Sequence, residues 1–153
     1  MRNAIFLVLY LTLTACPVYD APIGTLSIHN YTDSAVYIYS TCMDSIMNEP
    51  ALRLFLVDSA DRIDANGKKM PQIYSPNYRI NAYSYGTLYG FGSKNDKKVE
   101  CKDKCLRLFF IKEHVMRCNT WEEIVDGRMY QKKMSFSESQ LDSMNWEIRF
   151  EEH

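Results

Sequence analysis

The first half of the chain alternates hydrophobic and polar positions with the period of β-strands. Residues 25–30 place Leu26 and Ile28 on one face and polar side chains on the other. Residues 35–41 carry β-branched and aromatic side chains on both faces, which is typical of a strand in the middle of a sheet. Because a short polar segment at residues 31–33 separates them, these two strands are predicted to form a hairpin.

The middle of the chain contains two further strand candidates. Residues 52–57 and residues 106–112 share the segment Leu-Arg-Leu-Phe. A duplication would explain this match, but two similar core strands explain so short a match better. Between the two candidates, Asn66-Gly67 predicts a turn, and residues 77–92 alternate loosely and are rich in tyrosine.

The last third predicts two short helices. Thr120 followed three residues later by Glu123 fits a capping box, and Gly127 follows as a helix stop. Ser137 and Gln140 have the same spacing, so they predict a second capping box and a second helical turn.

Two further strands complete the predicted elements. Residues 130–136 can form one strand. Residues 145–150 alternate cleanly, with Trp146, Ile148 and Phe150 on the inward face. The sequence therefore predicts a mainly β fold, an antiparallel β-sandwich-like domain with two short helices near the C-terminus, closed by an edge strand.

The N-terminus has the form of a secretory signal. Arg2 precedes an apolar run at residues 4–11, which is far shorter than the roughly 20 residues of a membrane-spanning helix. The following segment, Leu13-Thr14-Ala15-Cys16, resembles the lipobox of bacterial lipoproteins. That resemblance implies cleavage before Cys16 and a lipid anchor on its thiol. The alternative is an ordinary signal peptide in which Cys16 is a chance residue.

These observations divide the chain into three parts. Residues 1–15 are predicted to be a lipoprotein signal peptide, residues 16–23 a tether, and residues 24–153 a single β-rich domain. The tether lacks the acidic run of surface-export signals, which favours the periplasmic face of the outer membrane in a bacterial cell envelope. The net charge is −1 and no basic patch occurs, so nucleic acid is not expected as a partner.

Four cysteines remain after Cys16: Cys42, Cys101, Cys105 and Cys118. An even number in an oxidising compartment suggests disulfides, with three connectivities open. Antiparallel pairing of the strands that Cys42 ends and Cys105 begins favours a bridge from Cys42 to Cys101 or Cys105. Two alternatives stay open: free thiols, or a zinc site made by three of the cysteines and His114, whose spacing is not a standard one.

No sequence pattern indicates catalysis, and we expect neither an enzyme nor a bound cofactor or metal. The histidines that could serve as a base are more typical of surface positions: His29, His114 and His153. Glu122 and Glu123 are explained by the start of a helix, where carboxylates favour the dipole.

The tyrosine-rich segment is the strongest indication of a binding function. If the segment is extended, Arg79, Asn81, Tyr83 and Tyr85 share one face of a strand. Flat aromatic rings beside hydrogen-bonding groups suit a glycan, although tyrosine is also a common strand residue. Two hypotheses follow: a binding or accessory module for a glycan or an envelope protein, or a structural lipoprotein subunit of a larger envelope complex.

Two resemblances complete the analysis. The motifs at residues 120–124 (TWEEI) and 141–148 (LxxMNWxI) resemble small lipoproteins of Bacteroides-type bacteria, which implies lipid attachment and a β-rich fold but no activity. Asp-Ser-apolar triplets resemble the acceptor of O-glycosylation in those bacteria, which implies modification at Ser34, Ser45 and Ser59. Such triplets also mark turns.

Overall fold

The structure is a computed structural model, and it describes residues 25–47, 56–58, 63–70, 73–89, 99 and 101–152. The predicted signal peptide, the tether with Cys16, and Ser59 lie outside these residues. Most of the predicted strand at residues 52–57 also lies outside them.

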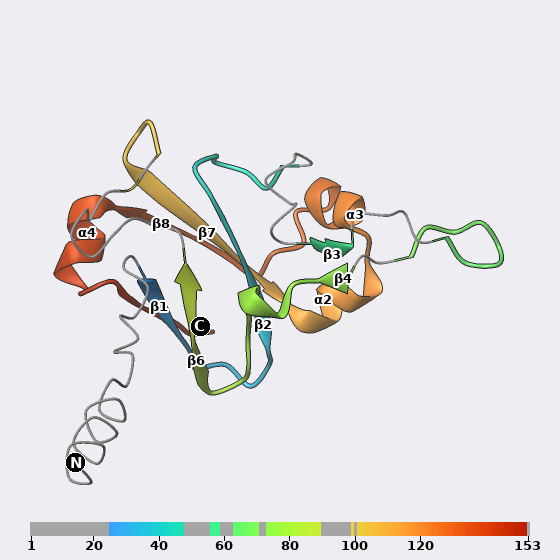
Figure 1. The fold of residues 1–153 in the computed structure, drawn as a ribbon, viewed down its shortest axis with the longest axis horizontal. Coiled ribbons are helices and arrows are strands. Elements are labelled where there is room, and N and C mark those ends of the chain that lie inside the picture. Colours follow the sequence, from blue (N-terminus) through green and yellow to red (C-terminus); the bar gives the residue numbers. More distant parts are fainter. Residues whose placement is uncertain are drawn as a thin grey trace, which may run out of the picture.

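Within the described residues the fold is mainly β, as predicted, and is built on two sheets (Figure 1). Sheet A has the order β6 (Ser84–Tyr89), β1 (Thr25–Asn30) and β9 (Glu147–Phe150). Strand β1 is antiparallel to β6 and parallel to β9. Sheet B is antiparallel, with the order β5 (Arg79–Ile80), β2 (Val36–Thr41), β7 (Cys105–Lys112) and β8 (Lys132–Ser137).

The remaining elements are short. Strands β3 (Leu56–Asp58) and β4 (Ile73–Tyr74) pair with each other, and η2 (Pro76–Tyr78) is one turn of 3₁₀ helix. The α-helices are α2 (Glu113–Cys118), α3 (Trp121–Asp126) and α4 (Glu138–Ser143). Figure 1 shows α4 at the opposite end of the molecule from α2 and α3. No helix in the described part of the chain has the length and apolar character that a membrane span requires.

Sheets A and B pack face to face around the main core. Leu26, Ile28 and Phe150 from sheet A meet residues such as Leu108 and Phe110 from sheet B. The rings of Phe110 and Phe150 stack between the sheets, with centroids 4.2 Å apart and planes 4° from parallel. The predicted central position of residues 35–41 is confirmed, because β2 lies between β5 and β7.

A second core lies on the other face of sheet B, beneath α2 and α3. There Phe109 and Ile111 of β7 pack with Met116 of α2 and with Trp121 and Ile124 of α3. Strand β7 is therefore buried on both faces, and the molecule has three layers: sheet A, sheet B and the pair α2 and α3.

The predicted hairpin of the first two strands is wrong, because β1 lies in sheet A and β2 in sheet B. The chain crosses between the sheets at the buried side chain of Asn30. Its amide nitrogen donates to the carbonyls of Ser34 (2.8 Å) and Asn81 (2.9 Å), and its oxygen accepts from the N–H (3.0 Å) and hydroxyl (2.8 Å) of Thr32. This network provides hydrogen-bond partners for the backbone where the chain bends from one sheet to the other. A tight hairpin turn would not need it.

The predictions for the C-terminal third are confirmed in most respects. Both capping boxes are present, at the starts of α3 and α4, and β9 is an edge strand of sheet A. Helix α2 was not predicted from the sequence, and it carries His114. Residues 132–137 form β8, close to the predicted strand at 130–136.

The expected roles of the two tryptophans are reversed. We expected Trp146 to be the more deeply buried, because it begins the alternation of the last strand, and Trp121 to be partly exposed at a helix start. Instead Trp121 is 3% exposed, and its indole N–H donates to the carbonyl of Met47 at 3.2 Å. Trp146 is half-buried at the margin of the main core and donates to Asp142 at 2.9 Å. Trp121 belongs to α3, and the packing of this helix on sheet B was not visible in the local pattern.

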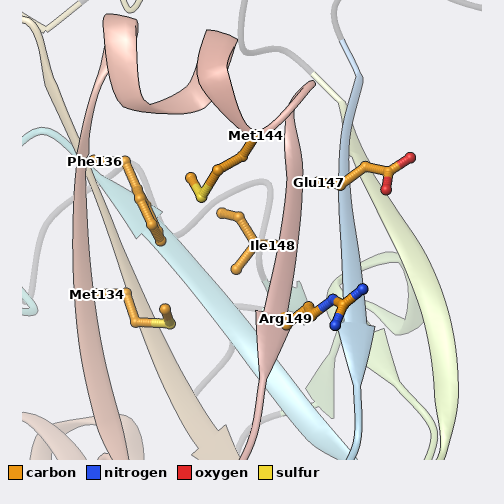
Figure 2. A pocket seen from close by; sticks show the side chains of 6 residues that line it. All are labelled: Met134, Phe136, Met144, Glu147, Ile148 and Arg149. Carbon is orange, nitrogen blue, oxygen red and sulfur yellow. The ribbon is translucent and has the colours of Figure 1, made fainter.

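One edge of the sandwich opens as a groove of about 370 Å³ between β8 and β9, beneath α4 (Figure 2). The apolar side chains of Met134, Phe136, Met144 and Ile148 face one another across it. The charged side chains that also border the groove, Glu147 and Arg149, extend from the other side of β9.

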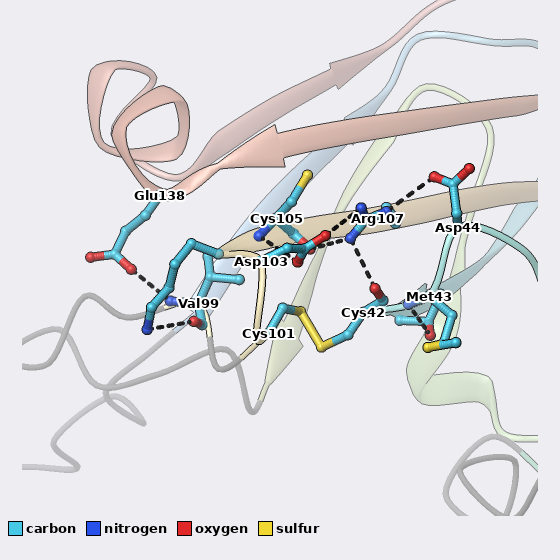
Figure 3. The surroundings of a disulfide bond; sticks show 11 residues. Cys42, Met43, Asp44, Val99, Cys101, Asp103, Cys105, Arg107 and Glu138 are labelled. Atoms are coloured by element: carbon cyan, nitrogen blue, oxygen red, sulfur yellow. Dashed lines mark hydrogen bonds and ion pairs between the residues drawn. A yellow bond between two sulfur atoms is a disulfide. The ribbon is translucent and has the colours of Figure 1, made fainter.

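A disulfide joins Cys42, just after β2, to Cys101, in the turn before β7 (Figure 3). The Cα atoms are 5.1 Å apart. Of the two predicted partners, Cys101 is the one that is bonded, because the turn closed by the Lys104 N–H and the Cys101 carbonyl (2.9 Å) folds it back toward β2. Cys105 and Cys118 are free thiols.

The Arg107 guanidinium holds the segments on both sides of this disulfide (Figure 3). It donates to the carbonyls of Cys42 (2.9 Å) and Cys105 (2.8 Å) and pairs with Asp103 (2.5 Å) and Asp44 (3.2 Å). Hydrogen bonds from Lys133 and Arg107 lower the pKa of Asp44. These contacts of Arg107 therefore stabilise the two segments that the disulfide joins.

Thiol labelling tests the disulfide. In the denatured, unreduced protein, Cys105 and Cys118 should react, and Cys42 and Cys101 should react only after reduction. Because the bridge closes a sequence separation of 59 residues, we expect Cys42→Ser to lower the free energy of unfolding by about 2–4 kcal/mol. The exposed Cys118→Ser is the matched control and should change it little. Labelling of Cys42 without reduction would contradict the pairing.

Urea unfolding tests the second core. We expect Trp121→Ala to lower the free energy of unfolding by about 3–5 kcal/mol, because it empties a fully buried site. Trp146→Ala should cost less, since its ring is half exposed, and the exposed Asp126→Ala serves as the control. A larger loss for Trp146→Ala than for Trp121→Ala would mean that α3 does not pack on sheet B as described.

Candidate functional site

The outer face of sheet A carries a row of ring and cationic side chains. The strand register places Tyr85 and Arg149 on either side of His29. The ring centroids of His29 and Tyr85 are 6.0 Å apart, and the His29 ring stacks on Tyr31 at 6.2 Å with planes 19° from parallel. The Arg149 guanidinium carbon lies 5.9 Å from the centroid of the Tyr31 ring. We call these four residues the aromatic face.

The rings of the aromatic face are open to solvent. Tyr85 is 72% exposed and Tyr31 is 48% exposed. Tyr83 adjoins the same end of the sheet, because its N–H donates to the Thr32 carbonyl at 3.2 Å, and it is 73% exposed. Exposed tyrosines next to a cation and an imidazole combine apolar stacking surface with hydrogen-bonding groups, which is the composition of a binding surface rather than of a core.

The predicted shared face of Arg79, Asn81, Tyr83 and Tyr85 does not form. The chain turns between β5 and β6, where Tyr83 adopts a left-handed conformation with φ of 50°. Arg79 consequently lies in sheet B and Tyr85 in sheet A. An uninterrupted strand would have been needed to align all four residues.

Arg79 is engaged in a local ion pair. Its guanidinium donates twice to the Glu113 carboxylate, at 3.0 Å for each bond, and also to the side-chain oxygen of Asn81. The hydrogen bonds from Arg79 lower the pKa of Glu113. These contacts join β5 to the start of α2, so they explain Arg79 and Asn81 as structural residues of the turn.

The other candidate residues make contacts elsewhere in the structure and not with the aromatic face. Because Cys101 is bonded to Cys42, it offers no thiolate to the zinc set suggested by the spacing. Glu123 caps α3 through the Thr120 N–H at 2.7 Å, and Glu122 pairs with Lys69 at 3.2 Å. The described residues contain no group of three His, Cys, Asp or Glu side chains that could hold a metal ion.

The serines of the Asp-Ser triplets lie in different surroundings. Ser45 is exposed in the bend after β2, and Ser34 is half-buried, with its hydroxyl donating to Asp33 at 3.0 Å. The exposure of Ser45 leaves its hydroxyl accessible to modification.

Three members of the aromatic face were missed from the sequence: His29, Tyr31 and Arg149. The alternation did place His29 and Arg149 on polar faces. Their proximity depends on the parallel pairing of β1 with β9, which joins residues more than a hundred positions apart. A strand pattern carries no signal for such a pairing.

Comparison with known proteins adds no relative: no protein-family model, no curated protein and no solved structure matches this chain.

Proposed function

We propose that the protein is a lipid-anchored binding module of the bacterial cell envelope that recognises a saccharide through its aromatic face. The observation that carries this proposal is the set of exposed tyrosine rings around His29 and Arg149 on sheet A. Sugar rings have apolar faces that stack on tyrosine, while their hydroxyls need donors and acceptors nearby. The Arg149 guanidinium and the His29 imidazole supply such groups.

The difference between the outer faces of sheets A and B supports a binding function for the aromatic face. The outer face of sheet B is covered by α2 and α3 and is apolar. The outer face of sheet A mixes rings with Ser27, Thr87 and Glu147, which belong to its polar side. A purely structural subunit would be expected to offer a flat apolar patch for permanent contact. The mixed surface fits reversible recognition better.

Affinity electrophoresis through gels containing neutral, acidic or amino-sugar polysaccharides tests saccharide binding. We expect at least one of these polysaccharides to retard the protein, and Tyr85→Ala to weaken that retardation about tenfold, which corresponds to ~1.4 kcal/mol. Tyr85→Phe keeps the ring and is the matched control. If no polysaccharide retards the protein, or if Tyr85→Ala binds as the wild type does, the aromatic face is not the binding surface.

The lipid anchor is the second part of the proposal, and it rests on the segment Leu13-Thr14-Ala15-Cys16. Two or more acyl chains make attachment stable, because each buried methylene contributes about 0.8 kcal/mol. An anchored module would keep the aromatic face close to envelope polysaccharides.

Metabolic labelling with a radioactive fatty acid tests the anchor. Cys16→Ala should remove the label and release the protein from the membrane fraction, whereas Cys118→Ala should retain both label and attachment. Label retained on Cys16→Ala would contradict lipidation at this position.

A further inference from the structure

Within the residues that the structure describes, strand β9 offers an open edge of sheet A. It is the last strand of its sheet, and its pairing with β1 uses the carbonyls of Trp146 and Phe150, which accept from Ser27 (3.0 Å) and Tyr31 (2.9 Å). Backbone groups alternate in direction along a strand, so the N–H and carbonyl of Arg149 point away from β1. An edge of this kind is a template for another strand.

The charges on β9 are self-complementary. Glu147 and Arg149 flank Ile148, and both are exposed on the outer face. If a second copy pairs antiparallel about Ile148, Glu147 of each copy stands opposite Arg149 of the other. Each Arg149 N–H can then donate to the Glu147 carbonyl of the other copy, which gives two backbone hydrogen bonds across the contact.

The same register joins the two grooves. Residues directly opposite one another in a sheet share a face, so Ile148 of one copy would lie opposite Ile148 of the other on the inward face, where the groove lies. Ile148 is itself only 1% exposed, so the half-buried groove residues Met134 and Met144 are the apolar side chains that a second copy would cover. The charges on β9 could instead serve only to prevent the edge from pairing with another strand. That role would not explain the apolar groove beside the strand.

The ends of the edge limit where a partner can enter. Helix α4 caps one end, and the Glu147 N–H is already donated to the Met144 carbonyl at 3.0 Å. At the other end the Lys132 ammonium donates to the Glu151 carbonyl at 3.4 Å. Between these ends the Glu147 carbonyl and the N–H and carbonyl of Arg149 face outward, and the antiparallel register about Ile148 pairs the Glu147 carbonyl of each copy with the Arg149 N–H of the other.

We propose that two copies of this chain associate through β9, with Glu147 of each copy opposite Arg149 of the other, to make one continuous six-stranded sheet. The contact is isologous and closes as a two-fold dimer. It places two aromatic faces side by side on one surface, and it requires neither the lipid anchor nor a saccharide.

A charge-swap series tests this proposal by sedimentation velocity on the full chain in mild detergent, over a range of concentrations. Wild type should dimerise. Glu147→Arg places arginine opposite Arg149, and Arg149→Glu places glutamate opposite Glu147, so each single variant should weaken the dimer at least tenfold. The double variant Glu147→Arg with Arg149→Glu restores opposite charges and should dimerise again. Asp126→Arg, an exposed change on α3, should leave the dimer intact.

Recovery in the double variant would identify this register, because a groove that binds an unrelated peptide gives no rescue of self-association. A monomeric wild type at every concentration would overturn the proposal. So would single variants that dimerise like the wild type, or a double variant that stays monomeric although it remains folded by circular dichroism.

Discussion

Strand β7 carries the constraint on which the other elements depend, because it must bury both of its faces. Leu108 and Phe110 point into the space between the sheets, whereas Phe109 and Ile111 point toward the helices. The consecutive phenylalanines therefore belong to different cores. A strand with two buried faces needs a layer on each side, and sheet A and the pair α2 and α3 are those layers. Helix α2 follows β7 directly in the chain, so the second layer starts where the strand ends.

Because sheets A and B pack face to face, the chain must cross between them. Hydrogen bonds of the Asn30 side chain stabilise these crossings. Residues 31–35 lead from β1 to β2, and residues 81–83 lead back from β5 to β6. The Asn30 side chain, 1% exposed, bonds to both connections. A buried polar group without a partner costs about 1–3 kcal/mol, so these bonds satisfy the buried Asn30 amide and at the same time tie the two crossings together. The same end holds Tyr31 and Tyr83, and the network thereby fixes where the aromatic face ends.

The sequence predicted local features well and long-range ones poorly, for a physical reason. The caps at Thr120 and Ser137 depend on side chains three residues away, so they could be identified from the chain alone. The hairpin of the first two strands failed because a polar turn does not reveal whether the next strand stays in the sheet. The burial of Trp121 and the partners of Tyr85 both depend on which strands become neighbours. Those neighbours are selected by the packing of whole layers.

A strained turn before β9 determines which side chains of this strand lie on the outer face of sheet A. Asn145 and Trp146 both have positive φ, 53° and 58°. Asparagine tolerates this conformation, but for tryptophan it costs about 1–2 kcal/mol. The cost is offset where the Trp146 N–H donates to the Leu141 carbonyl at 2.8 Å and its indole to Asp142 at 2.9 Å. This tight turn leads the chain from α4 into β9, which pairs with β1 and has Ile148 facing inward. Because strand side chains alternate, that single orientation puts Glu147 and Arg149 outward. The aromatic face and the open edge of sheet A thus both depend on the turn that connects α4 to β9.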